Sequence, residues 1–210
     1  MKRYIIAPAD APLPAFPNDA FDPDAEGFCA GEYAAIDAYP WGGDYRPEAR
    51  AYVRRDERGL LALLCAREDS VAARATEFGG EVWKDSCLEW FLKPFGDDDR
   101  YMNIEVNAAG VALIGVGAGR EGRRVLEACP RGMDIRASGH AGGWWAVAYA
   151  LPFEVISALF GQPFAPDHAL AGNFYCCDES LHPHFGCWNP INAPKPDFHR
   201  PEGFGEMGFE

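Results

Sequence analysis

The strongest constraint on the fold is a strict alternation of apolar and polar side chains in two stretches, 86–92 and 101–107. Successive side chains of a β-strand point to opposite faces, so each stretch predicts a strand with one apolar face for a core. The apolar faces are Leu88, Trp90 and Leu92 in the first stretch and Met102, Ile104 and Val106 in the second. The other faces carry a lone carboxylate, Glu89, and the polar run Tyr101, Asn103, Glu105 and Asn107.

Further strand-like runs and turn residues continue along the chain. Glycine and proline are frequent, with 23 and 17 residues, as expected for many short strands joined by turns. Two hairpins are predicted, 51–55 with 60–66 around the turn at 56–59, and 134–138 with 144–151 around the turn at 140–143. One helix is predicted at 152–160, where Pro152 suits the first helical position. We therefore predict an all-β fold, an antiparallel β-sandwich of the immunoglobulin-like or jelly-roll type with one short helix.

Domain organisation is predicted to be simple. The sequence has no internal repeat and no shift in composition that marks a boundary, so residues 1–210 are predicted to form one domain. Five prolines between residues 8 and 23 disfavour regular structure, and we predict that 1–24 is an extended leader on the surface. The tail from His182 is rich in aromatic side chains and is predicted to be irregular but packed on the sandwich.

Charge and cysteine content narrow the classes of partner. The 32 acidic and 19 basic residues give a formal net charge of −13, which disfavours binding to nucleic acid or to an anionic membrane. No stretch reaches the roughly 18 apolar residues of a membrane span, and the N-terminus lacks the apolar region of a signal peptide. We therefore expect a cytoplasmic protein, or an extracellular or periplasmic one if a secretion signal has been removed. Seven cysteines cannot all pair with one another, so reduced thiols are expected.

Three stretches, 82–94, 101–107 and 173–188, combine aromatic and polar residues in a way typical of a sugar-binding face. A pyranose has apolar C–H faces that lie on an indole ring, and a rim of hydroxyl groups that pairs with amides, carboxylates and guanidinium groups. Trp83 and Trp188 are the candidate stacking rings, with packing in the core as the alternative interpretation of each. The candidates for the hydroxyl groups are Glu89, Asn103, Glu105, Asn107 and Asn173.

Six short motifs lie between residues 83 and 205. They are Trp83-x-Asp85, Glu89-x-Phe91-Leu92-x-Pro94, Tyr101-x-Asn103-x-Glu105-x-Asn107-x-x-Gly110, Asn173-Phe174-Tyr175, His184-Phe185-Gly186-x-Trp188 and Pro196-x-Phe198-His199-x-Pro201-x-x-Phe204-Gly205. Together they resemble the family 9 carbohydrate-binding modules and their free-standing bacterial relatives. The resemblance implies an antiparallel β-sandwich that binds glycan chain ends, typically beside xylan- or cellulose-degrading enzymes. It also implies that Trp83 and Trp188 are the two sandwiching tryptophans and that Glu89 is the family's carboxylate.

The predicted function is therefore non-catalytic carbohydrate binding, with a xylan- or cellulose-type oligosaccharide as the ligand. One alternative is a glycoside hydrolase that uses Glu89 and Glu105 as general acid and nucleophile, since such enzymes place two carboxylates about 5–10 Å apart. A second alternative is an interaction domain that keeps the fold and has lost its ligand. The sequence has no Gly-x-Ser-x-Gly elbow, phosphate loop or dinucleotide fingerprint that would favour another enzyme class.

No cofactor is expected, although two metals are left open. Calcium is a candidate at the acidic run 97–99, which lacks the spacing of a calcium loop and predicts a solvated loop instead. Zinc ligands are available in the tail and the strand before it, without a recognised spacing, at Cys176, Cys177, His182, His184, Cys187 and His199. Adjacent residues of a strand point to opposite faces, so Cys176 and Cys177 cannot both join one site. Hydrogen-bonded histidines that hold the tail in place are the alternative interpretation.

Overall fold

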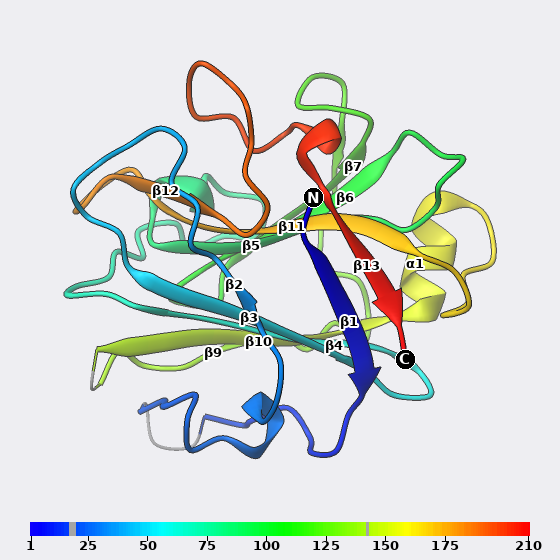
Figure 1. Cartoon of the computed structure of the whole chain (residues 1–210), viewed down its shortest axis with the longest axis horizontal. Helices are drawn as coiled ribbons and strands as arrows, with labels where there is room; N and C mark the ends of the chain where they lie inside the picture. Colours follow the sequence, from blue (N-terminus) through cyan, green and yellow to red (C-terminus); the bar gives the residue numbers. More distant parts are fainter. Residues whose placement is uncertain (17–19, 142) are drawn as a thin grey trace.

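The computed structural model describes residues 1–16, 20–141 and 143–210, and it consists of two layers of β-strands that face each other (Figure 1). The first layer, in the upper half of Figure 1, has the strand order β8-β7-β6-β5-β11-β13, and β12 pairs with β11. Its strands are β5 (Cys87–Lys93), β6 (Tyr101–Asn107), β7 (Ala112–Gly117), β8 (Arg124–Val125), β11 (Leu170–Asp178), β12 (His184–Cys187) and β13 (Gly205–Phe209). The alternating stretches that opened the sequence analysis are thus neighbouring strands, β5 and β6, as predicted.

The second layer has the order β3-β4-β10-β9, with β2 paired to β3. Its strands are β2 (Ala34–Ala35), β3 (Glu48–Arg55), β4 (Gly59–Arg67), β9 (Arg136–Ala137) and β10 (Trp144–Pro152). The strand β1 (Arg3–Pro8) joins the two layers, because its first four residues pair with β13 and its last two residues pair with β3. Both pairings of β1 are parallel, so the predicted antiparallel sandwich is in fact mixed at this strand.

The core lies between the two layers and contains both predicted apolar faces. Trp90 from β5 and Ile104 from β6 are fully buried there, and they share this core with Leu64 from β4 and Val147 from β10. Phe174 from β11 stacks on Trp90 with ring centroids 5.8 Å apart. The facing of the apolar side chains was therefore predicted correctly.

The outer face of the first layer is also covered. The short 3₁₀ helices η2 (Val82–Lys84) and η3 (Pro201–Gly203) and the chain between residues 185 and 204 lie over it. Tyr175 of β11 stacks on Phe198 of the tail with ring centroids 4.1 Å apart, and Phe91 of β5 is buried in the same cluster. The predicted packing of the tail on the sandwich is confirmed, and it leaves only part of this face open.

The predicted leader 1–24 needs a correction at its start. Residues 3–8 form β1, with Tyr4 and Ile6 buried, because they alternate between core and exterior before the proline run begins to break the ladder. After β1 the chain forms no strand before residue 16, and Phe16 and Phe21 pack on the outer face of the second layer. Pro17 of the proline run lies outside the described residues.

The predicted hairpins and helix are present with small differences. In the β3–β4 turn the Asp56 carboxylate accepts the backbone N–H groups of Arg58 and Gly59, each at 2.8 Å. The second hairpin is β9 with β10, and Gly142 of its predicted turn lies outside the described residues. The helix α1 (Phe153–Phe160) begins one residue later than predicted, since Pro152 is its N-cap with an extended ψ of 141°. No helix in the described part of the chain is long and apolar enough to cross a membrane.

Candidate ligand-binding site

A pocket opens on the outer face of the first layer, over β5, β6 and β11. Its walls come from η2, from the loop between β7 and β8, and from the tail. The lining residues are Trp83, Glu89, Phe91, Glu105, Arg120, Arg123, Cys177, Glu179, Phe185, Pro196, Asp197, Phe198 and His199. The pocket volume is about 140 Å³, roughly ten times the space that one water molecule needs. A ligand of about a dozen non-hydrogen atoms, the size of one hexose, fits such a space.

Two buried carboxyl groups form the floor of the pocket. Glu89 and Glu105 are directly opposite each other on β5 and β6, where side chains start about 5 Å apart. Only 2% of Glu89 and 3% of Glu105 is exposed. The Asn103 amide donates a hydrogen bond to the Glu105 carboxylate (Nδ2 to Oε1, 2.9 Å), and the Cys177 thiol donates one to Glu89 (Sγ to Oε1, 3.3 Å).

Burial controls the protonation of both carboxyl groups. It raises the pKa of Glu105 to about 7, against the opposing effect of the nearby guanidinium groups. The pKa of Glu89 also lies well above its usual value, first because of burial and second because of the charge of Glu105. Two carboxyl groups so close together resist simultaneous ionisation, so at neutral pH the pair retains a proton that it can donate to a ligand.

Arg120 and Arg123 bring positive charge to the rim of the same pocket. The Arg120 guanidinium forms an ion pair with the Asp197 carboxylate at 3.0 Å, and Arg123 donates from Nη1 to the Arg120 carbonyl oxygen at 2.9 Å. The loop can approach β7 closely because Gly115 and Gly117 have no side chains. A Cβ at Gly117 would lie 2.6 Å from the Cβ of Arg123, so a larger residue would push this arginine away.

Aromatic rings supply the apolar part of the lining. Trp83, in η2, is partly exposed and faces the same pocket as Phe185 of β12 and Phe198 of the tail. The His199 ring lies beside them, and its Nδ1 shares a hydrogen bond of 2.6 Å with the Tyr101 hydroxyl. Burial, with a further effect of the neighbouring guanidinium groups, lowers the pKa of His199 to about 3. The His199 ring is therefore neutral at ordinary pH, with one nitrogen that donates and one that accepts.

The structure places three of the predicted site residues in this pocket, Trp83, Glu89 and Glu105. A fourth, Asn103, is fully buried behind the floor and reaches the pocket only through its bond to Glu105. Its Oδ1 atom has no hydrogen-bond partner among the described residues. Asn103 therefore orients the Glu105 carboxylate.

Trp188, the predicted second stacking ring, is not on the pocket. Its side chain is only 3% exposed and packs in the core against Phe174 and Tyr4, with ring centroids 5.7 Å and 6.4 Å away. A Cβ at Gly205 would lie 2.4 Å from the indole, so the ring fits directly against the β13 backbone. The prediction that Trp188 is the second sandwiching ring is therefore wrong, and the alternative interpretation, packing in the core, is correct.

The remaining two predicted amides are used by the fold. The Asn173 amide donates to the Asn189 carbonyl oxygen at 2.8 Å and accepts from the Asn189 N–H at 2.8 Å, which pins the tail to β11. Asn107 donates to the Asp85 carboxylate at 2.9 Å and accepts two backbone N–H groups of the turn after β6. Both side chains are fully buried, so neither is available to a ligand.

Several pocket residues were not predicted as ligand contacts, namely Arg120, Arg123, Phe185, Asp197 and Phe198. Phe185, Phe198 and His199 stand inside the motifs quoted for the family resemblance, so a local signal existed for them. The two arginines come from a loop whose only marker was the spaced glycines at 115, 117 and 119. Two of those glycines, Gly115 and Gly117, make room for Arg123.

The predicted metal ligands are distributed over different places. Cys177 and His199 line the pocket, whereas Cys176 points to the core on the other face of β11, as strand geometry requires. Cys187 bonds to the Ala38 carbonyl oxygen, away from both. At the acidic run, Asp98 forms an ion pair with Arg100 at 2.6 Å, which occupies the best-buried carboxylate of that run.

Known proteins are similar to this chain. A family model described as carbohydrate-binding family 9 matches residues 28–209. The crystal structure of a "putative carbohydrate-binding protein" from Bacteroides uniformis ATCC 8492 is 33% identical with a TM-score of 0.74, and the match covers 85% of this chain and 86% of that one. Two structures of a family 9 module from Caldicellulosiruptor kristjanssonii share the fold, each with a TM-score of 0.63 and a match that covers 100% of this chain. The structure with glucose is 11% identical and is covered to 96%, and the structure with cellotriose is 10% identical and is covered to 94%. No curated protein matches.

Proposed function

This chain belongs to carbohydrate-binding family 9, and from that premise we propose that the pocket over Glu89 and Glu105 binds a neutral oligosaccharide of the xylan or cellulose type without transforming it. The observation that carries the proposal is the union of two features in one pocket: an accessible indole, Trp83, and a pair of buried carboxyl groups. A sugar ring presents a matching pair of features, an apolar face and a hydroxyl rim.

The carboxyl pair suits neighbouring hydroxyl groups of a sugar. A hydroxyl group both donates and accepts hydrogen bonds, and a carboxyl pair that retains one proton does the same. A fully ionised pair would only accept, and it would repel an anionic ligand in a chain whose net charge is −13. The rim arginines, Arg120 and Arg123, add donors for the hydroxyl groups that point away from the floor.

Trp83 is the proposed stacking ring, and in the absence of Trp188 the second apolar wall comes from Phe185 and Phe198. A phenyl ring covers less of a pyranose face than an indole does, so the pocket offers a smaller stacking area than two tryptophans would. The family 9 module structures with glucose and cellotriose support a glucan ligand for this fold. We therefore expect an affinity in the range of about 1 μM to 1 mM, which corresponds to about −8 to −4 kcal/mol.

The test is calorimetric titration of the protein with xylo- and cello-oligosaccharides, and with an oligogalacturonate as the charged comparison. Trp83→Ala and Glu89→Gln should each weaken binding by about tenfold or more, the equivalent of about 1.4 kcal/mol. Tyr33→Ala is the matched control, since Tyr33 is 43% exposed and lies away from the pocket lining. Binding only of the charged glycan, or equal affinity in Trp83→Ala and wild type, would refute the proposal.

The carboxyl pair also favours one other function. Directly opposite acids with raised pKa values are the elements of a retaining glycosidase, whose carboxylates lie about 5–5.5 Å apart. The same oligosaccharides, incubated with the protein and assayed for new reducing ends, separate the two functions. Binding without new reducing ends supports the module, whereas turnover that Glu89→Gln abolishes would support the hydrolase.

A further inference from the structure

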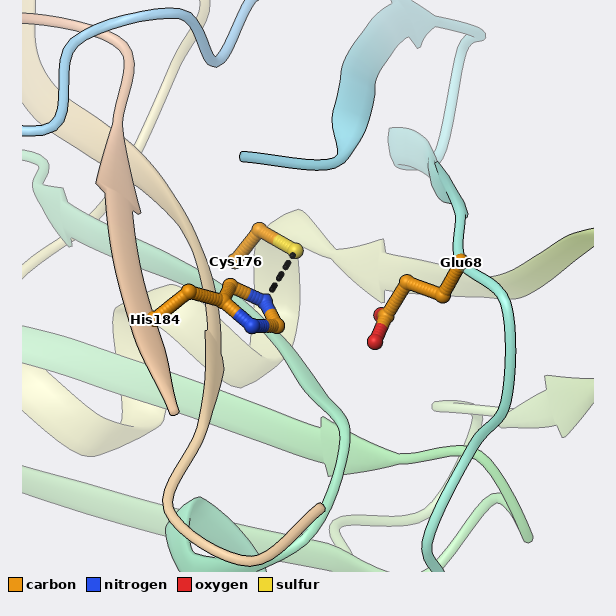
Figure 2. A group of neighbouring side chains, drawn as sticks. All are labelled: Glu68, Cys176 and His184. Atoms are coloured by element: carbon orange, nitrogen blue, oxygen red, sulfur yellow. Dashed lines mark hydrogen bonds between the residues drawn. The ribbon is translucent and has the colours of Figure 1, made fainter. Parts of the chain in front are cut away.

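Three metal-ligating side chains meet between the two layers, on the side of β11 that faces away from the pocket. They are Glu68, directly after β4, Cys176 of β11 and His184 of β12 (Figure 2). Their ligand atoms all lie within 4.8 Å of one another, and each side chain is buried, with at most 3% exposed. Figure 2 shows Cys176 and His184 side by side, with Glu68 approaching from the other layer.

His184 is oriented as a metal ligand usually is. Its Nδ1 lies 2.7 Å from the His182 carbonyl oxygen, so Nδ1 carries the proton and donates it there. The other nitrogen, Nε2, is then unprotonated and accepts a hydrogen bond from the Cys176 thiol at 3.5 Å, a bond that a metal ion would replace. Metal-bound histidines almost always donate their second N–H to a carbonyl or carboxylate in this way. Ligands on a tetrahedral zinc ion lie about 3.3–3.8 Å apart, which the Cys176–His184 separation already matches.

Glu68 gives a second, independent observation that fits a bound cation. Its Oε1 accepts a hydrogen bond from the Trp145 indole at 2.9 Å, but its Oε2 is buried with no hydrogen-bond partner among the described residues. None of the ion pairs found in the described ranges involves Glu68. A buried carboxylate without a cation is costly, and such groups are normally paired or bound to metal.

We propose that Glu68, Cys176 and His184 bind one Zn²⁺ ion, with a water molecule as the fourth ligand. Sulfur and imidazole donors favour zinc over calcium or magnesium, which prefer oxygen ligands. On binding, the Cys176 thiol releases its proton to solvent and the Glu68 carboxylate becomes a ligand through its free Oε2. The partly exposed Tyr45 ring packs edge-on against His184 at a centroid distance of 5.6 Å.

The ion would connect the two layers. Glu68 belongs to the second layer, and the other two ligands belong to the first. Because Cys176 and Cys177 point to opposite faces of β11, the zinc site and the sugar pocket lie on opposite sides of the same strand. Zinc is therefore expected to stabilise the sandwich and to leave the ligands of the pocket unchanged, which makes this proposal independent of the proposed function.

The experiment uses full-length, tag-free protein that is stripped with a chelator, dialysed against Zn²⁺ and freed of excess metal. We expect one zinc per chain by elemental analysis, and a melting temperature about 5–10 °C higher at a zinc concentration near 100 times the dissociation constant. Substitution by Co²⁺ should give a thiolate-to-cobalt charge-transfer band. Absence of retained zinc together with absence of that band would overturn the proposal.

Matched variants locate the ion. Cys176→Ser and Glu68→Gln should both lose the retained zinc and the cobalt band. Glu68→Gln serves as the second variant if Cys176→Ser does not fold, because glutamine keeps the shape of the side chain and one oxygen that accepts from Trp145. Cys65→Ser, equally buried in β4, should keep both signals. Cys177→Ser tests the second group of neighbouring ligands, Cys87, Glu89 and Cys177. Zinc that survives Cys176→Ser and disappears in Cys177→Ser would place the ion there and refute the assignment.

Discussion

Replacement of Glu105 by glutamine should stabilise the free protein at high pH and weaken sugar binding at the same time. In the folded protein burial raises the pKa of Glu105 from its usual 4.5 to about 7. The unfolded chain loses this proton near pH 4.5, so between pH 4.5 and 7 the folded state binds more protons than the unfolded state. Stability from this group is therefore full below pH 4.5 and is lost as the pH rises to about 7.

The size of the effect follows from the size of the shift. Each unit of pKa difference is worth 1.36 kcal/mol, so the wild type loses about 3 kcal/mol from this group by pH 8. Glutamine has nearly the same shape, keeps an oxygen to accept from Asn103 and has no proton to lose. The stability difference between Glu105→Gln and wild type should thus rise from near zero at pH 4.5 to about 3 kcal/mol at pH 8.

Urea unfolding of both proteins at several values between pH 4.5 and 8 measures this difference directly. Subtracting the two curves removes the contribution of every group that does not interact with Glu105, which leaves Glu105 and its interacting partner Glu89. Glu81→Gln is the control, because the Glu81 side chain is 61% exposed. The stability difference between this variant and wild type should not change with pH. A difference for Glu105→Gln that does not grow with pH would refute the reasoning. So would a variant that gains stability and binds sugar as tightly as wild type, since Glu105 would then not be part of the site.

The remaining predictions concern packing. Trp188→Ala should lower the free energy of unfolding in urea by about 3–5 kcal/mol, because removal of the buried indole leaves a cavity. Trp83→Ala should lower it far less, since the Trp83 ring is partly exposed. Similar losses at both positions would mean that Trp83 is a core residue. Gly205→Ala should destabilise by about 1–3 kcal/mol, since its Cβ would lie 2.4 Å from the Trp188 ring. Gly96→Ala, where a Cβ meets nothing within 4 Å, is the control and should change the unfolding free energy by less than about 0.5 kcal/mol.

The strands of the first layer were predictable because their information is local. A period of two residues places Leu88 and Trp90 on one face and Glu89 on the other, whatever the rest of the chain does. The same holds for the turn at Asp56, whose carboxylate satisfies the N–H groups of its own turn. The register that places Glu89 opposite Glu105 is not local, since it depends on the length of the loop between the strands.

The error at Trp188 has the same physical origin. The tail was expected to be irregular, and no direction can be assigned to a ring in an irregular segment. In the structure His184–Cys187 is a strand paired with β11, and alternation continued one residue further places Trp188 on the core side with His184. The same alternation places Phe185 on the pocket side. The alternation is present in the sequence, but only the pairing with β11 determines which of its two faces points to the core.

The outer face of β5 supports the proposal that the carboxyl groups serve a ligand and not the fold. The neighbours of Glu89 on that face, Cys87 and Phe91, are buried and apolar, and the tail packs over them. An apolar residue in place of Glu89 would satisfy this packing and avoid the desolvation of an acid. Departures from local rules at buried positions occur where function requires them. The gain in stability and loss of binding expected for Glu105→Gln are the two sides of that conflict, and measuring both in one variant shows whether the acids serve the ligand.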